Sequence, residues 1–310
     1  MKKQTKKIFR LRCWFLVIPV MTVLFLGGCG ASHKTSSSRH DAGSGVQIGT
    51  ITYSFGKMQG QSIAAVLDYA ISAGVNSVEL MGGPVEQYAG KPKGNDAKTL
   101  RDWRVGISMD KFKEIRKMFD EKGVRITALK LGEKNWSDEE IDYAFNVCRV
   151  LGAKGITMEI SEEVAQRIAP FANKHNLFII LHNHGQPGKP GFSFDKILAY
   201  GPKVMLNLDV GHYYGVTGLH PNTIIERLHD RIVCLHIKDK TGPKAAIPDK
   251  PVPFGSGGTP IAEILQLIQQ KKWPIICDIE MEYPIPAGSD AVKEVAKCVQ
   301  YCRAALVANK

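Results

Sequence analysis

The sequence contains no pair of cysteines at the two-residue spacing that zinc ribbons and redox motifs use. Its seven cysteines are an odd number, and two of them, Cys13 and Cys29, lie in the first 30 residues. The other five are spread through apolar segments. This pattern excludes both a disulfide framework and a zinc ribbon.

A glycine-rich phosphate loop is also lacking. No such loop follows the first predicted strand, and the glycines of FGSGG (residues 254–258) come after a proline-rich stretch, so we interpret them as a turn.

Basic charge is sparse in the body of the chain. The formal net charge is +11, but six positive charges lie within the first 12 residues, so the remainder carries +5. Without a stripe of lysine and arginine, no nucleic-acid partner is expected.

The first 30 residues have the pattern of an export signal. A basic start is followed by an apolar run from Cys13 to Leu26 and then by Gly27-Gly28-Cys29. The apolar run is short for a membrane span, which makes an uncleaved anchor the weaker alternative. The ending resembles the lipobox of bacterial lipoproteins and implies lipidation at Cys29.

We therefore predict three parts: a signal peptide (1–28), a flexible tether (29–45) and a folded domain (46–310). The tether is polar and serine-rich, as a structureless linker should be. The protein is expected to be exported and held by its lipid on the periplasmic side of a bacterial envelope. With 44% hydrophobic and 23% charged residues over 310 positions, the chain can bury one large core.

The body alternates short β-branched runs with longer segments of helical periodicity, and this alternation repeats eight times. Eight such units in about 265 residues predict a single-domain α/β fold, the (β/α)8 barrel. A doubly wound sheet is the alternative, and the missing phosphate loop argues against it. The predicted strands are 46–55, 76–82, 125–132, 155–161, 177–185, 204–212, 231–239 and 274–283.

Two connections are too long for simple turns. Residues 83–106 follow the second strand, and residues 240–258 follow the seventh. Both would lie on the face where barrel enzymes carry their active sites, so lids or substrate walls are plausible there. Trp103, in the first connection, is a candidate for substrate binding.

Four consecutive strands end in ionisable or polar side chains after apolar runs. Side chains two apart on a strand share a face, so each set is expected to reach the barrel mouth together. Buried charges of this kind need mutual partners or a metal ion. The four sets are His182 and His184; Asn207, Asp209 and, just past the strand end, His212; His236 and Lys238; and Asp278, Glu280 and Glu282.

Mixed imidazole and carboxylate ligands suit one divalent ion such as Mn, Co, Zn, Ni or Mg. Glu79 and Glu159, from the second and fourth strands, can join the same mouth. The segments LHNHG, NLDVGHYYGVTGLHP, DRIVCLHIKDK and DIEMEY resemble the xylose isomerase-like TIM barrel superfamily, the sugar phosphate isomerases/epimerases. The resemblance extends from Val46 to the C-terminus.

That resemblance implies a divalent metal held at the ends of strands five to eight, with Asp209, His236 and Glu280 as three of the ligands. His182 stands where relatives carry a glutamate, so either His182 or Glu159 is expected to complete the site. The His-Asn-His strand is similar to inosose dehydratases and to enzymes that cleave or hydrate 3-keto-glucosides.

Such a site supports removal of a proton from the carbon next to a carbonyl, through an enediolate. We expect Glu280 or Glu159 as the base, His184 or His212 as acid or hydrogen-bond partner, and Lys238 or Lys130 as electrophilic support. The expected substrate contacts are Glu79, Lys130, His184 and Trp103.

An exported protein is expected to meet unphosphorylated carbohydrates, so we predict a lyase or hydratase acting on 3-keto-glucosides. The alternatives are a sugar isomerase or epimerase and a catalytically inactive sugar-binding lipoprotein. DNA cleavage is disfavoured, although apurinic-site endonucleases share this barrel and the Asp-x-x-His spacing of Asp209 and His212. The expected partners are a small carbohydrate and the membrane through the lipid anchor, and a second copy of the chain is a further candidate.

Overall fold

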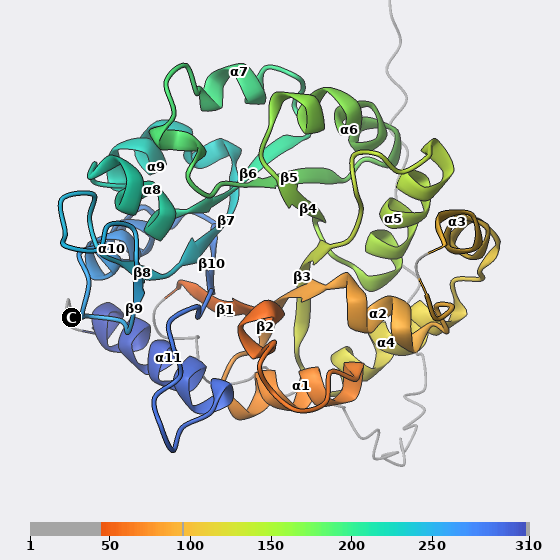
Figure 1. Ribbon diagram of the computed structural model, residues 1–310, viewed down its shortest axis with the longest axis horizontal. Coiled ribbons are helices and arrows are strands. Elements are labelled where there is room, and N and C mark those ends of the chain that lie inside the picture. The colour runs from red at the N-terminus through yellow and green to blue at the C-terminus, as the bar shows by residue number, and fades with distance from the viewer. Residues whose placement is uncertain (1–44, 95, 308–310) are drawn as a thin grey trace, which may run out of the picture. The chain divides into compact units, whose positions relative to one another are not determined.

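The computed structural model describes residues 45–94 and 96–307, and it confirms the predicted barrel (Figure 1). Eight parallel strands close into a ring in the order β1-β10-β7-β6-β5-β4-β3-β2. The predicted signal peptide, Cys29 and nearly all of the tether lie outside the described residues. The barrel strands are β1 (Gln47–Ile51), β2 (Ser77–Met81), β3 (Arg125–Lys130), β4 (Gly155–Glu159), β5 (Phe178–His182), β6 (Val204–Asp209), β7 (Ile232–Ile237) and β10 (Ile276–Ile279).

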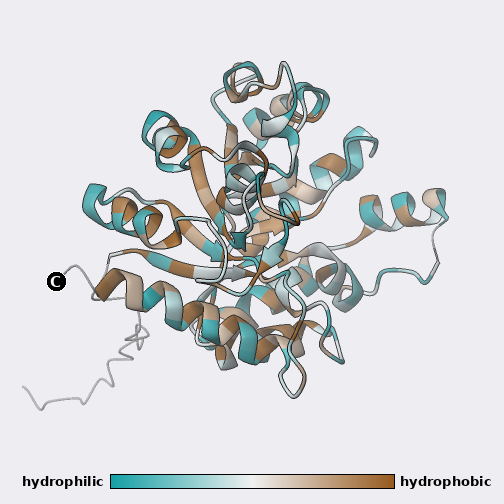
Figure 2. Cartoon of the chain, turned by 60° about the vertical axis from the view of Figure 1, so that its left-hand side comes forward, coloured by the Kyte–Doolittle hydropathy of each residue, from teal (hydrophilic) through white to brown (hydrophobic). Residues whose placement is uncertain are grey.

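Helices surround the ring, and their apolar faces pack against the outside of the strands (Figure 2). The bounds of the α-helices are α1 (Ile63–Ser72), α2 (Gly82–Tyr88), α3 (Ala97–Gly106), α4 (Asp110–Glu121), α5 (Asp138–Leu151), α6 (Glu162–His175), α7 (Phe194–Leu198), α8 (Val210–Thr217), α9 (Asn222–Leu228), α10 (Ile261–Lys271) and α11 (Ala291–Val307). In the described part of the chain, no helix combines the length and the apolar character that crossing a membrane requires.

The strands are shorter than predicted because the chain leaves the sheet where polar side chains begin. The first strand stops at Ile51 and continues as a short 3-10 helix, Thr52–Phe55. The sixth stops at Asp209, where α8 begins. The Asp209 carboxylate accepts a hydrogen bond from the His212 backbone N–H at 2.7 Å and so caps this helix. The sequence pattern missed α8, which carries His212.

Both long connections are ordered. Residues 83–106 contain most of α2 and all of α3, and Arg104 ties α3 to the barrel through ion pairs with Glu86 (2.8 Å) and Glu140 (2.9 Å). Residues 239–252 form an antiparallel hairpin of β8 (Asp239–Lys240) and β9 (Pro251–Val252). The predicted turn at 254–258 is confirmed, and its Gly255 and Gly257 N–H groups donate to the Asp239 carboxylate.

The barrel interior changes character along its axis. Its lower layer is a small apolar cluster that includes Ala128, Ile180 and Ile276, so Ile180 fills the interior below His182 as expected. Above it come buried polar side chains, among them Glu79, Asn207 and Asp278. The five cysteines of the described region are all buried and unpaired, which agrees with the absence of a disulfide framework.

Candidate metal centre and active site

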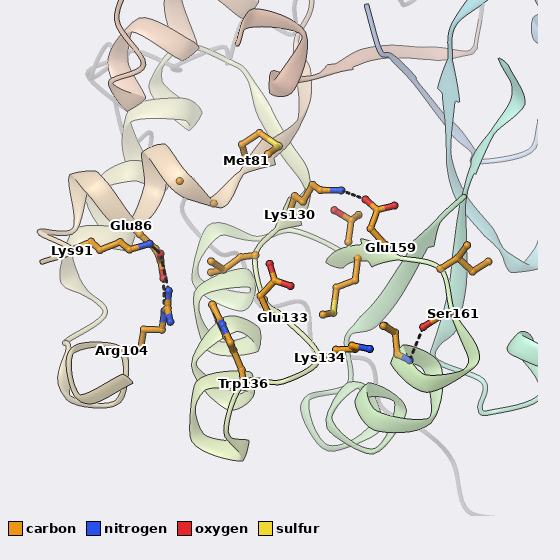
Figure 3. Close-up of a pocket in the computed structure, with 18 residues that line it drawn as sticks. Met81, Glu86, Lys91, Arg104, Lys130, Glu133, Lys134, Trp136, Glu159 and Ser161 are labelled. Atoms are coloured by element: carbon orange, nitrogen blue, oxygen red, sulfur yellow. Dashed lines mark hydrogen bonds and ion pairs between the residues drawn. The ribbon is translucent and has the colours of Figure 1, made fainter. Parts of the chain in front are cut away.

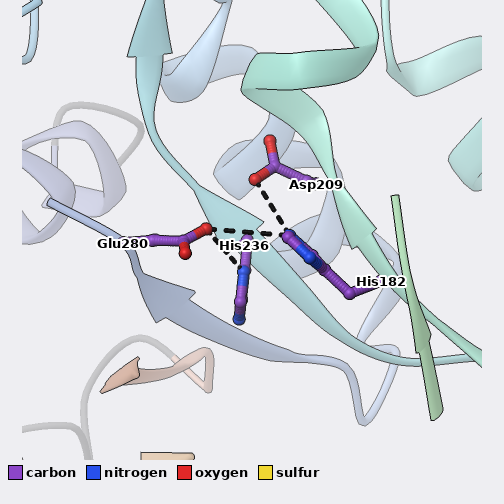
Figure 4. Close-up of side chains that lie close together, drawn as sticks. All are labelled: His182, Asp209, His236 and Glu280. Carbon is purple, nitrogen blue, oxygen red and sulfur yellow. Dashed lines mark hydrogen bonds and ion pairs between the residues drawn. The ribbon is translucent and has the colours of Figure 1, made fainter. Parts of the chain in front are cut away.

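Four side chains converge at the mouth of the barrel, from the ends of four neighbouring strands (Figure 4). One ligand atom from each lies within 4.8 Å of the other three, and all four residues are buried. Asp209 is paired in register with His236, and Glu280 directly follows β10. The four residues are His182, Asp209, His236 and Glu280.

The donor atoms suit a divalent ion. Nε2 of His182 lies 3.3 Å from Asp209 Oδ2 and 3.7 Å from Glu280 Oε2, and His236 Nδ1 lies 2.8 Å from that same glutamate oxygen. Two imidazole nitrogens and two carboxylate oxygens form a set that Mn, Co or Zn accepts. The residues present therefore fit the metal that the sequence predicts.

A buried carboxylate orients His236. Its Nε2 lies 2.9 Å from Glu79 Oε2, which also accepts from Asn207 Nδ2, while Thr157 donates to Glu79 Oε1 at 2.6 Å. Because Glu79 accepts the Nε2 proton, the Nδ1 lone pair of neutral His236 faces the centre. Glu79 is only 1% exposed, which corrects the expectation that it contacts substrate. It positions His236 instead.

The charge state of His236 couples metal binding to protons. Burial alone would lower the pKa of this imidazole, but the carboxylates of Glu280 and Glu79 raise it well above the usual value. His236 is therefore protonated in the metal-free protein at neutral pH. A metal that takes Nδ1 must displace this proton, so metal affinity is expected to rise with pH.

Lys238 is the cation built into this cluster. Its Nζ lies 2.8 Å from Glu280 Oε2, 3.1 Å from Asp209 Oδ2 and 2.7 Å from Glu282 Oε2. Burial would lower the pKa of Lys238, but the three carboxylates raise it. Lys238 thus pairs with Asp209 and Glu280, two of the candidate metal ligands. A metal ion bound there would compete with the ammonium group for the same carboxylate oxygens.

This competition predicts a stability effect for Lys238→Met. Metal-free variant protein is expected to lose about 3 kcal/mol of unfolding free energy, because three carboxylates stay packed together without their cation. Saturating divalent metal should restore most of that loss. Denaturant unfolding with chelator and with metal measures both values, and Lys134→Met, which removes an exposed ion pair with Glu163, is expected to change little. An equal loss in both conditions would contradict the competition.

Glu159 lies outside the four-residue set. Its Oε1 is 2.7 Å from Lys130 Nζ, and its Oε2 is 3.0 Å from His184 Nδ1 and 3.6 Å from His182 Nδ1. Glu159 therefore lies near Nδ1 of His182, whereas Asp209 lies near Nε2 of the same ring. Glu159, His182 and His184 form a second, more exposed group of possible ligands. In that group Lys130 already neutralises the carboxylate.

The electrostatics keep Glu159 ionised. Burial would raise its pKa, but the imidazoles of His182 and His184 and the charge of Lys130 outweigh burial and lower it. The side chain is half exposed, whereas Glu280 is 4% exposed and lies against both His236 and Lys238. Of the two predicted bases, Glu159 is the one that a substrate can reach.

Lys240 fixes the protonation of His212. The Lys240 ammonium lies 2.9 Å from His212 Nδ1 and 2.7 Å from Asp249 Oδ1. An ammonium group has no acceptor, so Nδ1 accepts and the imidazole proton resides on Nε2. Burial is the main cause that lowers the pKa of His212 to about 3; Asp209 opposes it, while Lys238, Lys240 and His184 add to it. His212 is thus a neutral hydrogen-bond donor at the mouth rather than a general acid.

Comparisons with known proteins agree with this barrel. The family model of the xylose isomerase-like TIM barrel matches residues 156–302. The matched segment is just under half of the chain, and the closed eight-stranded barrel agrees with the fold in the description of that family. No curated protein sequence matches it.

Three solved structures share this barrel at low sequence identity, and they support its fold. A sugar phosphate isomerase/epimerase from Parabacteroides distasonis is 20% identical, with a TM-score of 0.59 over 84% of this chain and 96% of its own. The probable 3-DHS dehydratase AsbF from Bacillus anthracis is 17% identical, with a TM-score of 0.58 over 82% and 98%. The IolI protein with a bound zinc atom is 14% identical, with a TM-score of 0.60 over 85% and 99%.

In this barrel, the tautomer of His212 can be tested through Lys240→Met. Removing the ammonium is expected to raise the pKa of His212 towards its usual value and to free Nδ1. Nitrogen-15 NMR of the imidazoles reports both changes directly. Lys244→Met, in the same hairpin, should leave the His212 signals unchanged. Unaltered His212 signals in Lys240→Met would contradict the assignment.

Trp103 does not join the mouth of the barrel. It lies on α3, and its ring packs edge-on against Tyr143, with ring centroids 6.1 Å apart. Its predicted substrate contact is therefore not supported. Trp136, in the connection after β3, lines a cavity beside Glu159 instead.

Sequence reasoning placed Glu282 at the mouth without a role and missed Lys240 and Trp136. Lys240 follows Lys238 by two positions, so the alternation along the chain could have suggested it. Trp136 lies only a few residues past the end of β3, and its position there could have suggested it.

Proposed function

We propose that this chain is a divalent-metal-dependent enzyme that removes a proton from the carbon next to a carbonyl of an unphosphorylated sugar or keto-sugar. The observation that carries this proposal is the convergence of two imidazoles and two carboxylates beside an ionised, accessible Glu159. A metal ligand set next to a base is what proton abstraction from a weak carbon acid requires.

When bound, the metal would supply a Lewis acid for the carbonyl and an adjacent hydroxyl of the substrate. His182, Asp209, His236 and Glu280 would hold it. Glu159 accepts the proton from carbon. The electron pair left on that carbon moves towards the carbonyl oxygen.

Neighbouring residues support this step. His212 donates its Nε2 proton to a substrate oxygen, and the adjacent Lys130 and His184 orient Glu159. Lys238 balances the ligand carboxylates from a buried position, so we no longer assign it to the substrate.

The fate of the proton decides the reaction. If Glu159 returns it to a different carbon or face, the product is an isomer or epimer. If a β-oxygen substituent leaves instead and takes up a proton, the product is that of a dehydratase or lyase. We favour lyase or hydratase action on 3-keto-glucosides, because His182 replaces a carboxylate that proton return would use. The dehydratase AsbF supports elimination on this fold, and the isomerase/epimerase neighbour supports the second candidate.

Exchange of the carbon-bound proton tests the shared step. A panel of 3-keto-glucosides and free ketoses in heavy water, followed by NMR with added manganese or cobalt, should show deuterium entering next to the carbonyl. Chelator should stop the exchange, and Glu159→Gln should slow it by about 100-fold or more. Lys113→Met, which removes an exposed ion pair with Asp110 on α4, serves as an unchanged control. Turnover with full retention of the substrate proton would exclude both reaction classes, and metal-independent sugar binding without exchange would favour an inactive binding protein.

We also propose that the protein is exported and anchored to the membrane through lipid on Cys29. The sequence of residues 13–29 supports this proposal. Metabolic labelling with an alkyne fatty acid should tag the wild-type chain and fail for Cys29→Ser, while Cys13→Ser remains a mature lipoprotein. Labelling that persists in Cys29→Ser would contradict the anchor.

A further inference from the structure

A cavity of about 560 Å³ lies at the mouth beside the metal centre (Figure 3). The ends of β2, β3 and β4 and the segments that follow them form its walls, so it occupies the side of the mouth away from Asp209 and Glu280. Its volume falls within the range of about 300–1,000 Å³ that small-molecule sites occupy. None of the four residues His182, Asp209, His236 and Glu280 lines it, so it offers space beyond the metal centre.

One ion pair separates the cavity from the metal centre. Lys130 and Glu159 both line the cavity and lie 2.7 Å apart, and the other oxygen of Glu159 is 3.0 Å from His184. A ligand whose reacting carbon meets Glu159 at the metal centre can therefore extend across this pair. Glu159 would then contact the reacting part of the ligand, and the cavity would hold the part bonded to it.

The cavity has one rigid aromatic surface. The Arg104 guanidinium carbon lies 3.9 Å from the centre of the Trp136 ring. Glu86 and Glu140 hold Arg104 in turn. Arg104 therefore fixes the plane of this indole along the cavity wall (Figure 3). A fixed aromatic ring offers a large apolar face at low entropic cost, and the C–H face of a sugar ring or an aromatic aglycone can stack on such a face.

Each cation that lines the cavity has a carboxylate partner within the protein, and the remaining charged residue of the lining, Glu133, is itself a carboxylate. Lys91 pairs with Glu86, Lys130 with Glu159 and Lys134 with Glu163, and Arg104 has two carboxylate partners. A phosphate group would have to break these pairs to find a cation. A neutral polyhydroxylated ligand can instead hydrogen-bond to the paired groups without loss of charge balance.

We propose that this cavity binds the second ring of a neutral glycoside, with Trp136 as its stacking surface. The inference rests on the proposed function: the oxidised ring occupies the metal centre, and the group joined to it by the glycosidic bond occupies the cavity. The substrate class is then a two-ring glycoside rather than a free monosaccharide or a sugar phosphate.

Binding to protein without a working metal centre separates this inference from the proposed reaction. Asp209→Ala protein is mixed in turn with cellobiose, glucose and inorganic phosphate, and saturation-transfer NMR measures each affinity. Cellobiose is expected to bind at least about tenfold more tightly than glucose, and phosphate should not compete. Adding Trp136→Ala should remove this preference, whereas Trp136→Phe keeps an aromatic ring and should retain most of it.

Trp103→Ala is the matched control, because that tryptophan packs against Tyr143 away from the cavity lining. It should leave the preference for cellobiose unchanged. The thermal unfolding midpoint of every variant shows whether it is folded. Equal affinities for cellobiose and glucose, a preference that survives in folded Trp136→Ala, or displacement of cellobiose by phosphate would each overturn the proposal. Failure of the heavy-water exchange with intact cellobiose binding would remove the reaction and leave the cavity as a disaccharide site.

Discussion

An Asp209→Ala chain is expected to bind divalent metal at least about 100-fold more weakly than the wild type. The substitution removes one of four donors and leaves Lys238 paired with Glu280 and Glu282. In the wild type, metal at 100 times its dissociation constant should add about 2.7 kcal/mol to the free energy of unfolding. Denaturant unfolding with and without metal should show that gain in the wild type and at most about 0.4 kcal/mol in Asp209→Ala.

Asp209 also caps α8, so a second variant is needed to separate this cap from metal binding. Its other oxygen caps α8 through the His212 N–H, so Asp209→Ala also loses about 1 kcal/mol in the metal-free state. Asp209→Asn keeps an oxygen for the cap and removes only the charge. It should retain most of the metal-free stability while still losing most of the metal affinity. Metal stabilisation of Asp209→Ala equal to that of the wild type would show that the ion binds elsewhere.

Asp278→Asn is expected to stabilise the protein at alkaline pH. Asp278 is fully buried beside Glu79 and Cys234, and neither of its oxygens has a hydrogen-bond partner within the described residues. Burial, reinforced by the charge of Glu79, raises the pKa of this carboxyl from 3.8 to about 8. The folded protein therefore holds a proton on Asp278 at neutral pH.

The direction of the pH effect follows from that proton. Between pH 3.8 and about 8 the unfolded chain has lost the Asp278 proton and the folded chain has kept it. The contribution of Asp278 to stability is complete below pH 3.8 and falls by about 1.4 kcal/mol per pH unit up to about pH 8. Asparagine resembles the neutral carboxyl and cannot ionise. The variant should therefore match the wild type near pH 4 and exceed it by on the order of 5 kcal/mol at pH 8.

Unfolding free energies measured from pH 4.5 to 8.5 test this difference. The variant curve should diverge steadily upward from that of the wild type. Asp68→Asn, which removes an exposed carboxylate on α1, is the control and should follow the wild-type curve throughout. Parallel curves for Asp278→Asn and the wild type would show that Asp278 ionises normally inside the barrel.

Most of the site residues that were predicted from the sequence follow from the two-residue alternation of side chains along a β-strand. Residues two apart on a strand share a face, so the alternation around His182, Asp209, His236 and Glu280 was enough to bring four strand ends to one mouth. Eight strand-and-helix units were likewise enough to predict closure of the barrel. These features depend on local pattern and on the number of units.

The sequence did not predict how deep each side chain lies in the barrel or which residues of neighbouring strands are paired. Glu79 lies next to a register shift between Val78 and Glu79, and another shift precedes Asn207. These irregularities bring Glu79, Asn207 and the far nitrogen of His236 to one level inside the barrel. A sequence pattern shows which face a side chain shares, but it does not show which layer across the ring that side chain reaches.

The other errors come from contacts made by the long connections. Trp103 and Trp136 are equally conspicuous in the sequence, and only the placement of α3 turns the first against Tyr143 and leaves the second along the cavity. Lys240 reaches His212 because the hairpin of β8 and β9 forms beside α8. Both outcomes depend on packing between segments that are far apart in the chain.

Anomalous X-ray scattering from crystals grown with manganese or zinc tests the metal centre most directly. Data collected at the absorption edge of the metal should show one peak per chain, surrounded by His182 Nε2, Asp209 Oδ2, His236 Nδ1 and Glu280 Oε2 at coordination distances of about 2.0–2.2 Å. The Lys238 ammonium group should then lie farther from Asp209 and Glu280 and remain paired with Glu282. A map with no peak among these four atoms, and with Lys238 still bridging Asp209 and Glu280, would contradict a metal-dependent reaction at this site.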